Sequence, residues 1–232
     1  MRYWLYVAML LAVCGMAMAE APAEVPGLML WMRADAGVTK DAEGRVAAVK
    51  DQSGTGNDFI QADPALQPLL VTADNGQPAL RFDGVDDVLS LATALPVTGK
   101  SVFAAVKWNK AKTYSFALGL DAGTDGYLRM SNATRLLVGG RYPMLYQNSI
   151  PSPKVGYTAG DGRQIFHNDL RSLLQWNVYA ITDNPQPNER LKHLGKNELN
   201  NVPENRFDGE IAEVLVYDRA LSAAERLKIE EY

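Results

Sequence analysis

Acidic side chains are the first residues in this chain whose spacing could support catalysis. A retaining glycosidase needs two carboxyl groups about 5–5.5 Å apart, flanking the bond that is cleaved. Alternate positions of one strand could supply such a pair, because alternate side chains share a face. Asp41 and Glu43 have this spacing but fall in a glycine-containing turn. Glu210 and Glu213 are three positions apart, so a regular strand would direct them to opposite faces. The spacing therefore argues against glycoside hydrolysis.

Two other kinds of catalytic centre also lack their residues. A serine hydrolase of the G-x-S-x-G type is not indicated, because that motif is missing from the sequence. The two histidines, His167 and His193, lie in polar sequence and are expected to be solvated. Two histidines and the single Cys14 are too few for a tetrahedral zinc site. We expect no catalytic residues, no enzyme activity and no cofactor.

Calcium is the one metal for which the sequence offers candidate ligands. Residues 51–58 (DQSGTGND) place Asp51, Asn57 and Asp58 in a loop that glycines make flexible. The loop begins like an EF-hand, but its twelfth position is Ala62 instead of glutamate. The alternative is a turn in which the Asp and Asn side chains bond nearby backbone donors. Residues 83–87 (DGVDD) form a second acidic loop with the same two interpretations.

Sugar binding would need aromatic faces for the ring and planar polar groups for the hydroxyls. Residues 139–153 (GGRYPMLYQNSIPSP) bring both kinds together in one loop. We take Arg141, Tyr142, Tyr146 and Asn148 as the candidate ligand-binding residues there, with an ordinary surface loop as the alternative.

Three tryptophans and one glutamate have both a structural and a binding interpretation. Trp31, Trp108 and Trp176 sit in or beside expected strands, which favours packing in the core. Glu213 is expected to share a strand face with Ile211. It would then be either a ligand group on an open sheet or one half of a structural ion pair, and the second is preferred.

The N-terminal residues indicate export. Residues 1–19 combine a basic start, an apolar run and an A-x-A cleavage pattern, as a secretory signal peptide does. Lipidation at Cys14 is the alternative. Residues 20–26 (EAPAEVP) are expected to be a linker, and residues 27–232 one domain. We therefore expect a secreted, periplasmic or cell-surface protein with no membrane insertion after cleavage. The net charge of −4, without any basic run, argues against nucleic acid as a partner.

The rest of the chain indicates an all-β domain with a helix at its end. Short alternating stretches such as residues 101–108 (SVFAAVKW) are separated by Gly, Asp, Asn and Pro clusters. Residues 210–217 (EIAEVLVY) are apolar on both faces, which indicates a central strand. Ser222 followed by Glu225 is the pattern of a helix capping box.

The tetrapeptide RFDG occurs twice, at residues 81–84 and 206–209. The strand period predicts that Phe82 and Phe207 point into the core, while Arg81 and Arg206 are largely exposed. Each Asp-Gly pair would then suit a turn. We interpret the echo as one structural solution used twice, without a ligand.

Three segments resemble the laminin-G-like branch of the concanavalin A-like lectin/glucanase superfamily. They are residues 50–61, residues 77–91 and residues 207–232, the last containing G-x-I-A-E-V-x-x-Y-D-R-A-L-S-x-x-E. The resemblance implies a two-sheet antiparallel jelly-roll sandwich with a short C-terminal helix, and ligands on the concave sheet or its loop rim. Glucanases of that superfamily carry E-x-D-x-x-E on one strand, and this sequence lacks that array.

Two functions remain open at this point. The leading one is an exported, non-catalytic recognition module for a polysaccharide or a glycoprotein glycan. The other is a structural or protein-adhesion module. Sugar binding, tested with and without a chelator, would distinguish them.

Overall fold

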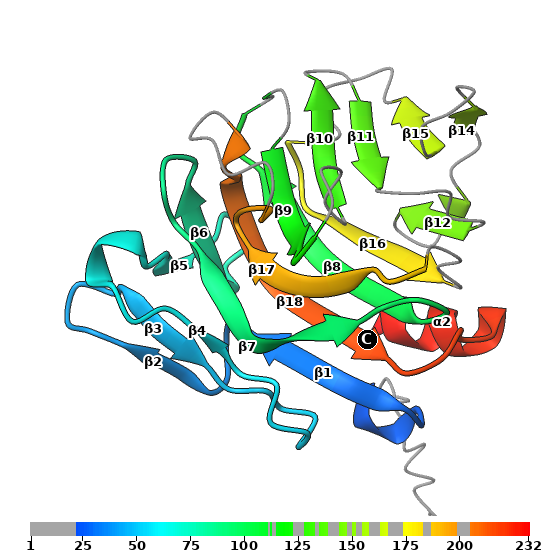
Figure 1. Ribbon diagram of the computed structural model, residues 1–232, viewed down its shortest axis with the longest axis horizontal. Coiled ribbons are helices and arrows are strands. Elements are labelled where there is room, and N and C mark those ends of the chain that lie inside the picture. The colour runs from blue at the N-terminus through cyan, green and yellow to red at the C-terminus, as the bar shows by residue number, and fades with distance from the viewer. Residues whose placement is uncertain are drawn as a thin grey trace, which may run out of the picture.

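The computed structural model describes, with side chains, residues 22–110, 112, 115–122, 128, 174–182, 187–198 and 205–232. Between residues 129 and 166 it describes the backbone of the strands alone. The predicted all-β sandwich is confirmed, because the described strands form two antiparallel sheets. Figure 1 shows β7, β17 and β9 of one sheet lying in front of β8 and β18 of the other. We call the sheet that contains β18 sheet A and the other sheet B.

Sheet A has eight described strands, and β1 pairs with β18 beside the main path. In spatial order they are β13 (Ile150–Pro151), β12 (Met144–Gln147), β16 (Asn177–Thr182), β8 (Ser101–Trp108), β18 (Asp208–Tyr217), β6 (Pro78–Asp83) and β5 (Leu69–Thr72), with β1 (Leu28–Arg33) next to β18.

Sheet B has ten described strands. In spatial order they are β14 (Val155–Tyr157), β15 (Arg163–Phe166), β11 (Arg135–Val138), β10 (Leu128–Asn132), β9 (Ser115–Leu120), β17 (Arg190–Leu194), β7 (Leu89–Pro96), β4 (Phe59–Ile60), β3 (Val46–Val49) and β2 (Val38–Lys40).

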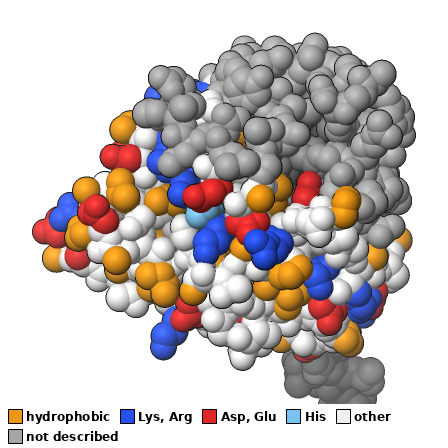
Figure 2. All heavy atoms as spheres, viewed as in Figure 1, with side chains coloured by type: hydrophobic (Ala, Val, Ile, Leu, Met, Phe, Trp, Pro, Cys, Tyr) orange, Lys and Arg blue, Asp and Glu red, His pale blue; other side chains and the backbone are white. Residues whose placement is uncertain are grey.

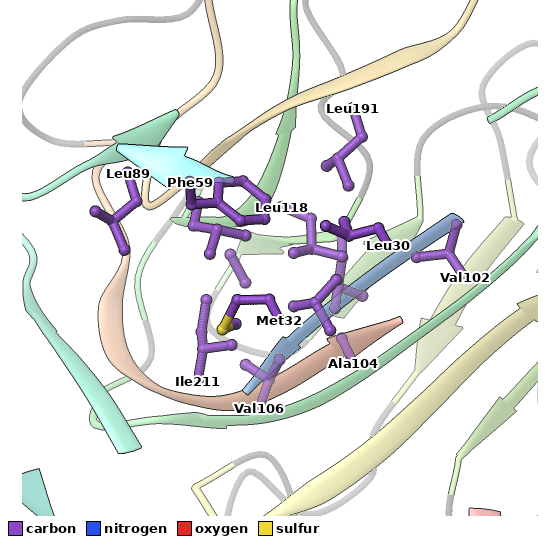
Figure 3. Close-up of a cluster of buried hydrophobic side chains, with 14 of the residues drawn as sticks. Leu30, Met32, Phe59, Leu89, Val102, Ala104, Val106, Leu118, Leu191 and Ile211 are labelled. Carbon is purple, nitrogen blue, oxygen red and sulfur yellow. The ribbon is translucent and has the colours of Figure 1, made fainter. Parts of the chain in front are cut away.

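The main core lies between the sheets, where alternate residues of each strand point inward. The predicted inward face of β8 is confirmed, because Val102, Ala104, Val106 and Trp108 are all buried in this core. Figure 3 shows labelled core side chains from both sheets: Leu30, Met32, Val102, Ala104, Val106 and Ile211 from sheet A, and Phe59, Leu89, Leu118 and Leu191 from sheet B.

A second apolar cluster covers the opposite, outer face of sheet A. Helix α2 (Ala223–Glu231) packs there through Ile229, against Phe103 and Leu215. The predicted capping box is confirmed, with Ser222 and Glu225 bonding each other's backbone N–H groups. Two short 3-10 helices, η1 (Pro22–Glu24) and η2 (Pro64–Leu66), complete the described elements. Among the residues that the structure describes, no helix is long and apolar enough to span a bilayer.

The two RFDG segments lie side by side. The antiparallel register of β6 and β18 pairs Asp83 with Asp208 and Phe82 with Gly209. The predicted burial of Phe82 and Phe207 is confirmed, and their rings lie 5.7 Å apart. The echo is therefore two adjacent strand ends that supply one aromatic contact.

The polar residues of the echo differ from the prediction in the second copy. Arg81 is exposed as expected, but Arg206 is half-buried and Asp208 is buried. Gly84 occupies a turn with φ +77°, whereas Gly209 lies inside β18. A Cβ at Gly209 would come within 2.3 Å of the Lys107 carbonyl oxygen, so close strand packing requires the glycine there.

A β-bulge in β18 changes which way its acidic residues face. The register with β8 shifts between Ile211 and Glu213, and Ala212 is the extra residue. Ile211 lies in the core between the sheets, while Glu213 lies on the outer face of sheet A with Leu215. The expectation that Glu213 shares a face with Ile211 is therefore wrong. Glu210, which bonds the exposed Arg81, also faces outward, so the bulge places both glutamates on one face.

Candidate functional site

A cleft of about 460 Å³ opens on the outer face of sheet A. It lies where β18 changes its hydrogen-bonding partner from β6 to β1. Its walls come from the end of β1, the β5–β6 turn, the start of β16, the bulge of β18 and the residue after α2. The lining residues are Arg33, Asp35, Asn75, Gln77, Pro78, Ala105, Trp176, Asn177, Val178, Ala212, Glu213 and Tyr232.

Glu213 is the carboxylate at the floor of this cleft. The bulge turns it outward, and the indole N–H of Trp31 donates a hydrogen bond to its Oε1. Burial raises the pKa of the Glu213 carboxyl, while the Trp31 hydrogen bond and the positive charge of Arg33 oppose that rise. A carboxyl group with these properties can accept hydrogen bonds and can hold a proton more readily than a solvated glutamate.

Arg33 and Asp35 form the charged pair of one wall. The guanidinium donates from Nε and Nη2 to the two Asp35 oxygens, at 2.8 and 2.6 Å. Its carbon lies 5.0 Å from the centre of the Trp31 ring, within the range of a cation–π contact. The hydrogen bond with Asp35 raises the pKa of Arg33.

A second charged cluster, formed by Asp74 and Lys107, lies just outside the cleft next to Trp176. Asp74 accepts hydrogen bonds from Lys107 Nζ at 2.6 Å and from the Trp176 indole N–H at 3.0 Å. These bonds, led by the one from Lys107, lower the pKa of the Asp74 carboxyl. Asp74 thereby fixes the indole of Trp176, which is half-buried and lines the cleft.

Two aromatic residues, Trp176 and Tyr232, line the cleft together with Glu213. Tyr232 has 42% of its surface exposed and meets Trp31 edge to face, with ring centres 6.1 Å apart. Trp176 is bonded to Asp74, and the neighbouring Asn75 and Gln77 line the cleft with exposed amide side chains. Two accessible aromatic rings and several planar polar groups around one hollow are what a sugar ring and its hydroxyls require.

The four ligand-binding side chains predicted from the sequence lie outside the described part of the structure. Arg141, Tyr142 and Asn148 lie outside the described residues, as does the side chain of Tyr146, whose backbone belongs to β12. Sequence reasoning missed the cleft, and it assigned Trp176 to the core, which is wrong because that ring lines the cleft.

The other two tryptophans are buried, as expected. Trp108 lies in the core between the sheets, and Trp31 packs on the outer face of sheet A. Trp31 also bonds Glu213, which the sequence gave no reason to expect because the two residues are 182 positions apart.

The first calcium candidate is an internally bonded turn. The Oδ1 of Asp51 accepts from the backbone N–H groups of Trp31 and Ser53, and its Oδ2 accepts from the hydroxyls of Ser53 and Thr55 and the N–H of Asn57. Asp58 in turn accepts from the N–H of Asp51. The backbone-bonding alternative explains these oxygens, because they are already occupied by donors.

The second acidic loop gathers three carboxyl groups within 4.8 Å of one another, from Asp83, Asp86 and Asp87. Burial raises the pKa of Asp87 to about 7, and the neighbouring charges of Asp83 and Asp86 add to the rise. Asp87 also accepts a hydrogen bond from the N–H of Asp83 at 2.9 Å. This bond, together with the one from the Val85 N–H to Asp83 Oδ1, explains the loop as a turn.

His193 is buried, so the expectation that it is solvated is wrong. Ser90 Oγ lies 2.8 Å from its Nδ1, and Glu198 Oε2 lies 2.6 Å from its Nε2. The order Ser–His–Glu is that of a hydrolase triad. However, burial lowers the pKa of His193 to about 4, which makes it a poor base at neutral pH. The three side chains form a polar link between β7, β17 and the turn after β17. His167 lies outside the described residues.

Charges on the described surface are mixed. On the face that Figure 2 shows, described acidic and basic side chains are interspersed, and they form no broad area of one sign.

No protein-family model and no curated protein matches this chain. Among solved structures, it is similar to Trypanosoma rangeli sialidase in complex with sialic acid, with a TM-score of 0.51 and 12% identity. That match covers 89% of this chain and 33% of the sialidase chain.

The chain is also similar to a GH54 α-L-arabinofuranosidase. In a mutant soaked with 4-nitrophenyl α-L-arabinofuranoside the identity is 15%, and in the enzyme soaked with a cyclic sulfate inhibitor it is 16%. Both have a TM-score of 0.45 and cover 81% of this chain and 50% of theirs. The chain thus spans a third to a half of these proteins, and at such identities the likeness concerns the β-rich fold alone.

Proposed function

We propose that this protein is an exported, non-catalytic carbohydrate-recognition domain of the laminin-G-like branch of the concanavalin A-like superfamily. Its binding site is the cleft on the outer face of sheet A. The observation that carries the proposal is the pairing of two accessible aromatic residues, Trp176 and Tyr232, with planar polar groups around one hollow of about 460 Å³. That volume falls in the range of small-ligand sites.

The carboxyl groups of the cleft support recognition rather than catalysis. A retaining glycosidase needs a protonated acid and a second carboxylate that is free to attack. Asp35 is held by both nitrogens of the Arg33 fork, and Glu213 accepts the indole N–H of Trp31. Carboxyl groups held by such bonds have fixed positions, and they can accept hydrogen bonds from the hydroxyls of a sugar.

Isothermal titration calorimetry against defined oligosaccharides tests this function. We expect binding by the wild type, and a loss of about tenfold or more in Trp176→Ala and in Tyr232→Ala, since each removes a stacking ring. Ile60→Ala is the matched control, because Ile60 is an exposed apolar residue on sheet B. Unchanged affinity in both aromatic variants would reject the cleft as the site. No binding of any sugar would favour a structural or adhesion role.

One observation favours a second candidate, a glycoside hydrolase. The bulge at Ala212 places Glu213, with its raised pKa, in a cleft that also contains Asp35. Glu213 would then be the general acid. Turnover of an aryl glycoside by the wild type, lost in Glu213→Gln with binding retained, would establish this function. Sugar binding without turnover would support the recognition domain.

A further inference from the structure

Arg33 in the cleft and Lys107 beside it are each paired with a carboxylate of the protein itself. Arg33 is paired with Asp35 through two hydrogen bonds, and Lys107 is paired with Asp74 at 2.6 Å. We infer from this pairing that the cleft selects uncharged, hydroxyl-bearing sugar units and discriminates against sugars that carry a carboxylate. This inference rests on the proposed function and defines the class of its ligand.

An acidic sugar would need a cation that is free to receive it. Arginine recognises a carboxylate best when two N–H groups of its fork donate together. In Arg33 the Nε and Nη2 groups already donate to Asp35, and the face of the guanidinium lies over Trp31. A ligand carboxylate would either displace Asp35 or bind the remaining Nη N–H groups of a guanidinium whose charge Asp35 already balances.

The lysine beside the cleft is no more available. The Lys107 side chain is only 15% exposed, and its ammonium group bonds Asp74. Asp74 is in turn fixed by the indole of Trp176. If Lys107 turned to a ligand carboxylate, Asp74 would lose its cation. The Trp176 indole, which bonds Asp74 and lines the cleft, would then be less firmly held.

Glu213 adds a further reason for rejecting anions. Among the described residues that line the cleft, two carboxyl groups, Asp35 and Glu213, face one basic group, Arg33. A ligand carboxylate near the floor would meet a like charge, and a like charge in a partly buried site costs binding free energy. A sugar hydroxyl, in contrast, can donate to the same Glu213 oxygens without that cost.

The side chains of the cleft that are left to recognise a ligand are uncharged amides and aromatic rings. The amide side chains of Asn75 and Gln77 are exposed at one edge, and each offers both a donor and an acceptor. The rings of Trp176 and Tyr232 offer apolar faces. This set matches the alternating hydroxyls and C–H faces of an uncharged sugar.

The test compares uncharged and acidic oligosaccharides of equal length by calorimetry. Xylo-, gluco- and galacto-oligosaccharides form the neutral set, and oligogalacturonate and sialyllactose form the acidic set. We expect the best neutral ligand to bind at least about tenfold more tightly than any acidic one, because a displaced or unmatched charged hydrogen bond costs that much or more. Neutral binding should also be insensitive to salt.

The variant Asp35→Asn should shift this preference. It removes one carboxylate and frees the Arg33 fork, so acidic affinity should rise about tenfold and become dependent on salt. Asp41→Asn is the matched control, because it removes the carboxylate from a similar pair, Asp41 with Arg45, that lies outside the cleft. The Asp41→Asn protein should bind as the wild type does.

The outcomes separate the two proposals. If the wild type prefers acidic sugars, or binds them with a steep salt dependence, the inference is wrong and the recognition function stands. If no sugar of either set binds, the recognition function itself fails and the inference falls with it. Should Asp35→Asn fold poorly, the salt dependence of the wild type still decides the question.

Discussion

Acidification should destabilise this protein through His193. Burial lowers the pKa of its imidazole from 6.5 to about 4, and the positive charge of Lys196 adds to the effect, while the bond to Glu198 opposes it. Between these two pH values the unfolded chain binds a proton at this position and the folded chain does not. The free energy of unfolding must therefore fall as the pH falls from about 6.5 towards 4.

The size of the effect follows from the shift. One pKa unit corresponds to about 1.4 kcal/mol, so the difference between 6.5 and about 4 gives at most about 3 kcal/mol. A domain of this size has a free energy of unfolding of roughly 5–15 kcal/mol, so a loss of that size is measurable by urea denaturation. The stabilisation is complete above pH 6.5 and is lost progressively below it.

Two measurements check this reasoning. The sequence contains two histidines, so the His167→Asn variant leaves one imidazole whose titration can be followed by NMR. Urea denaturation of the wild type and of His193→Gln, at pH values from 7 to 4.5, then isolates the contribution of this residue from that of the other titrating groups. An imidazole that titrates between pH 6 and 7, or equal pH slopes for both proteins, would refute the argument.

Three further predictions concern the core, the acidic loop and export. Phe82→Ala and Phe207→Ala should each lower the free energy of unfolding by about 3–5 kcal/mol, while Val85→Ala, at a site 57% exposed, should change it little; a loss below about 1 kcal/mol in both Phe variants would contradict the packing. Asp87→Asn should stabilise the protein above pH 7, because the folded state holds a proton that the unfolded state releases between about pH 4 and pH 7; equal urea midpoints at pH 8 would count against this. Export should remove residues 1–19, and an intact mass that retains a lipid at Cys14 would show otherwise.

Local patterns predicted much of the fold. The alternation in residues 101–108 is that of β8, whose inward side chains lie in the core as expected. Residues 210–217, apolar on both faces, form most of β18, which lies between β8 on one side and β6 and β1 on the other. Ser222 and Glu225 marked the start of α2. Each of these features depends on residues that are close together in the chain, along one strand or at one helix end. A single sequence is therefore enough to predict them.

The polar interior was not predictable in the same way. His193 has lysines on either side of it in the sequence, Lys192 and Lys196, and such a neighbourhood is typical of a solvated loop. What buries it is the strand pairing of β17 with β7 and β9. Its partner Ser90 is 103 residues away, a separation that no local pattern reports.

The cleft depends on a discontinuity that the sequence does not display. One edge of β18 pairs with β6 from Asp208 to Ile211, and the same edge pairs with β1 from Glu213 to Tyr217. Ala212 lies between these two partners, and its carbonyl oxygen accepts a hydrogen bond from the N–H of Ala34. The gap between the ends of β1 and β6 is where the cleft opens.

The same residue explains why sequence reasoning misjudged Glu213. Strict alternation along residues 210–217 puts Glu213 on the face of Ile211, and only an extra residue in the strand can separate them. With Ala212 as that residue, β18 directs Ile211 into the core and Glu213 into the cleft. The extra residue thus lies at the junction of the two partners on one edge of β18, and it also orients the carboxylate at the floor of the site.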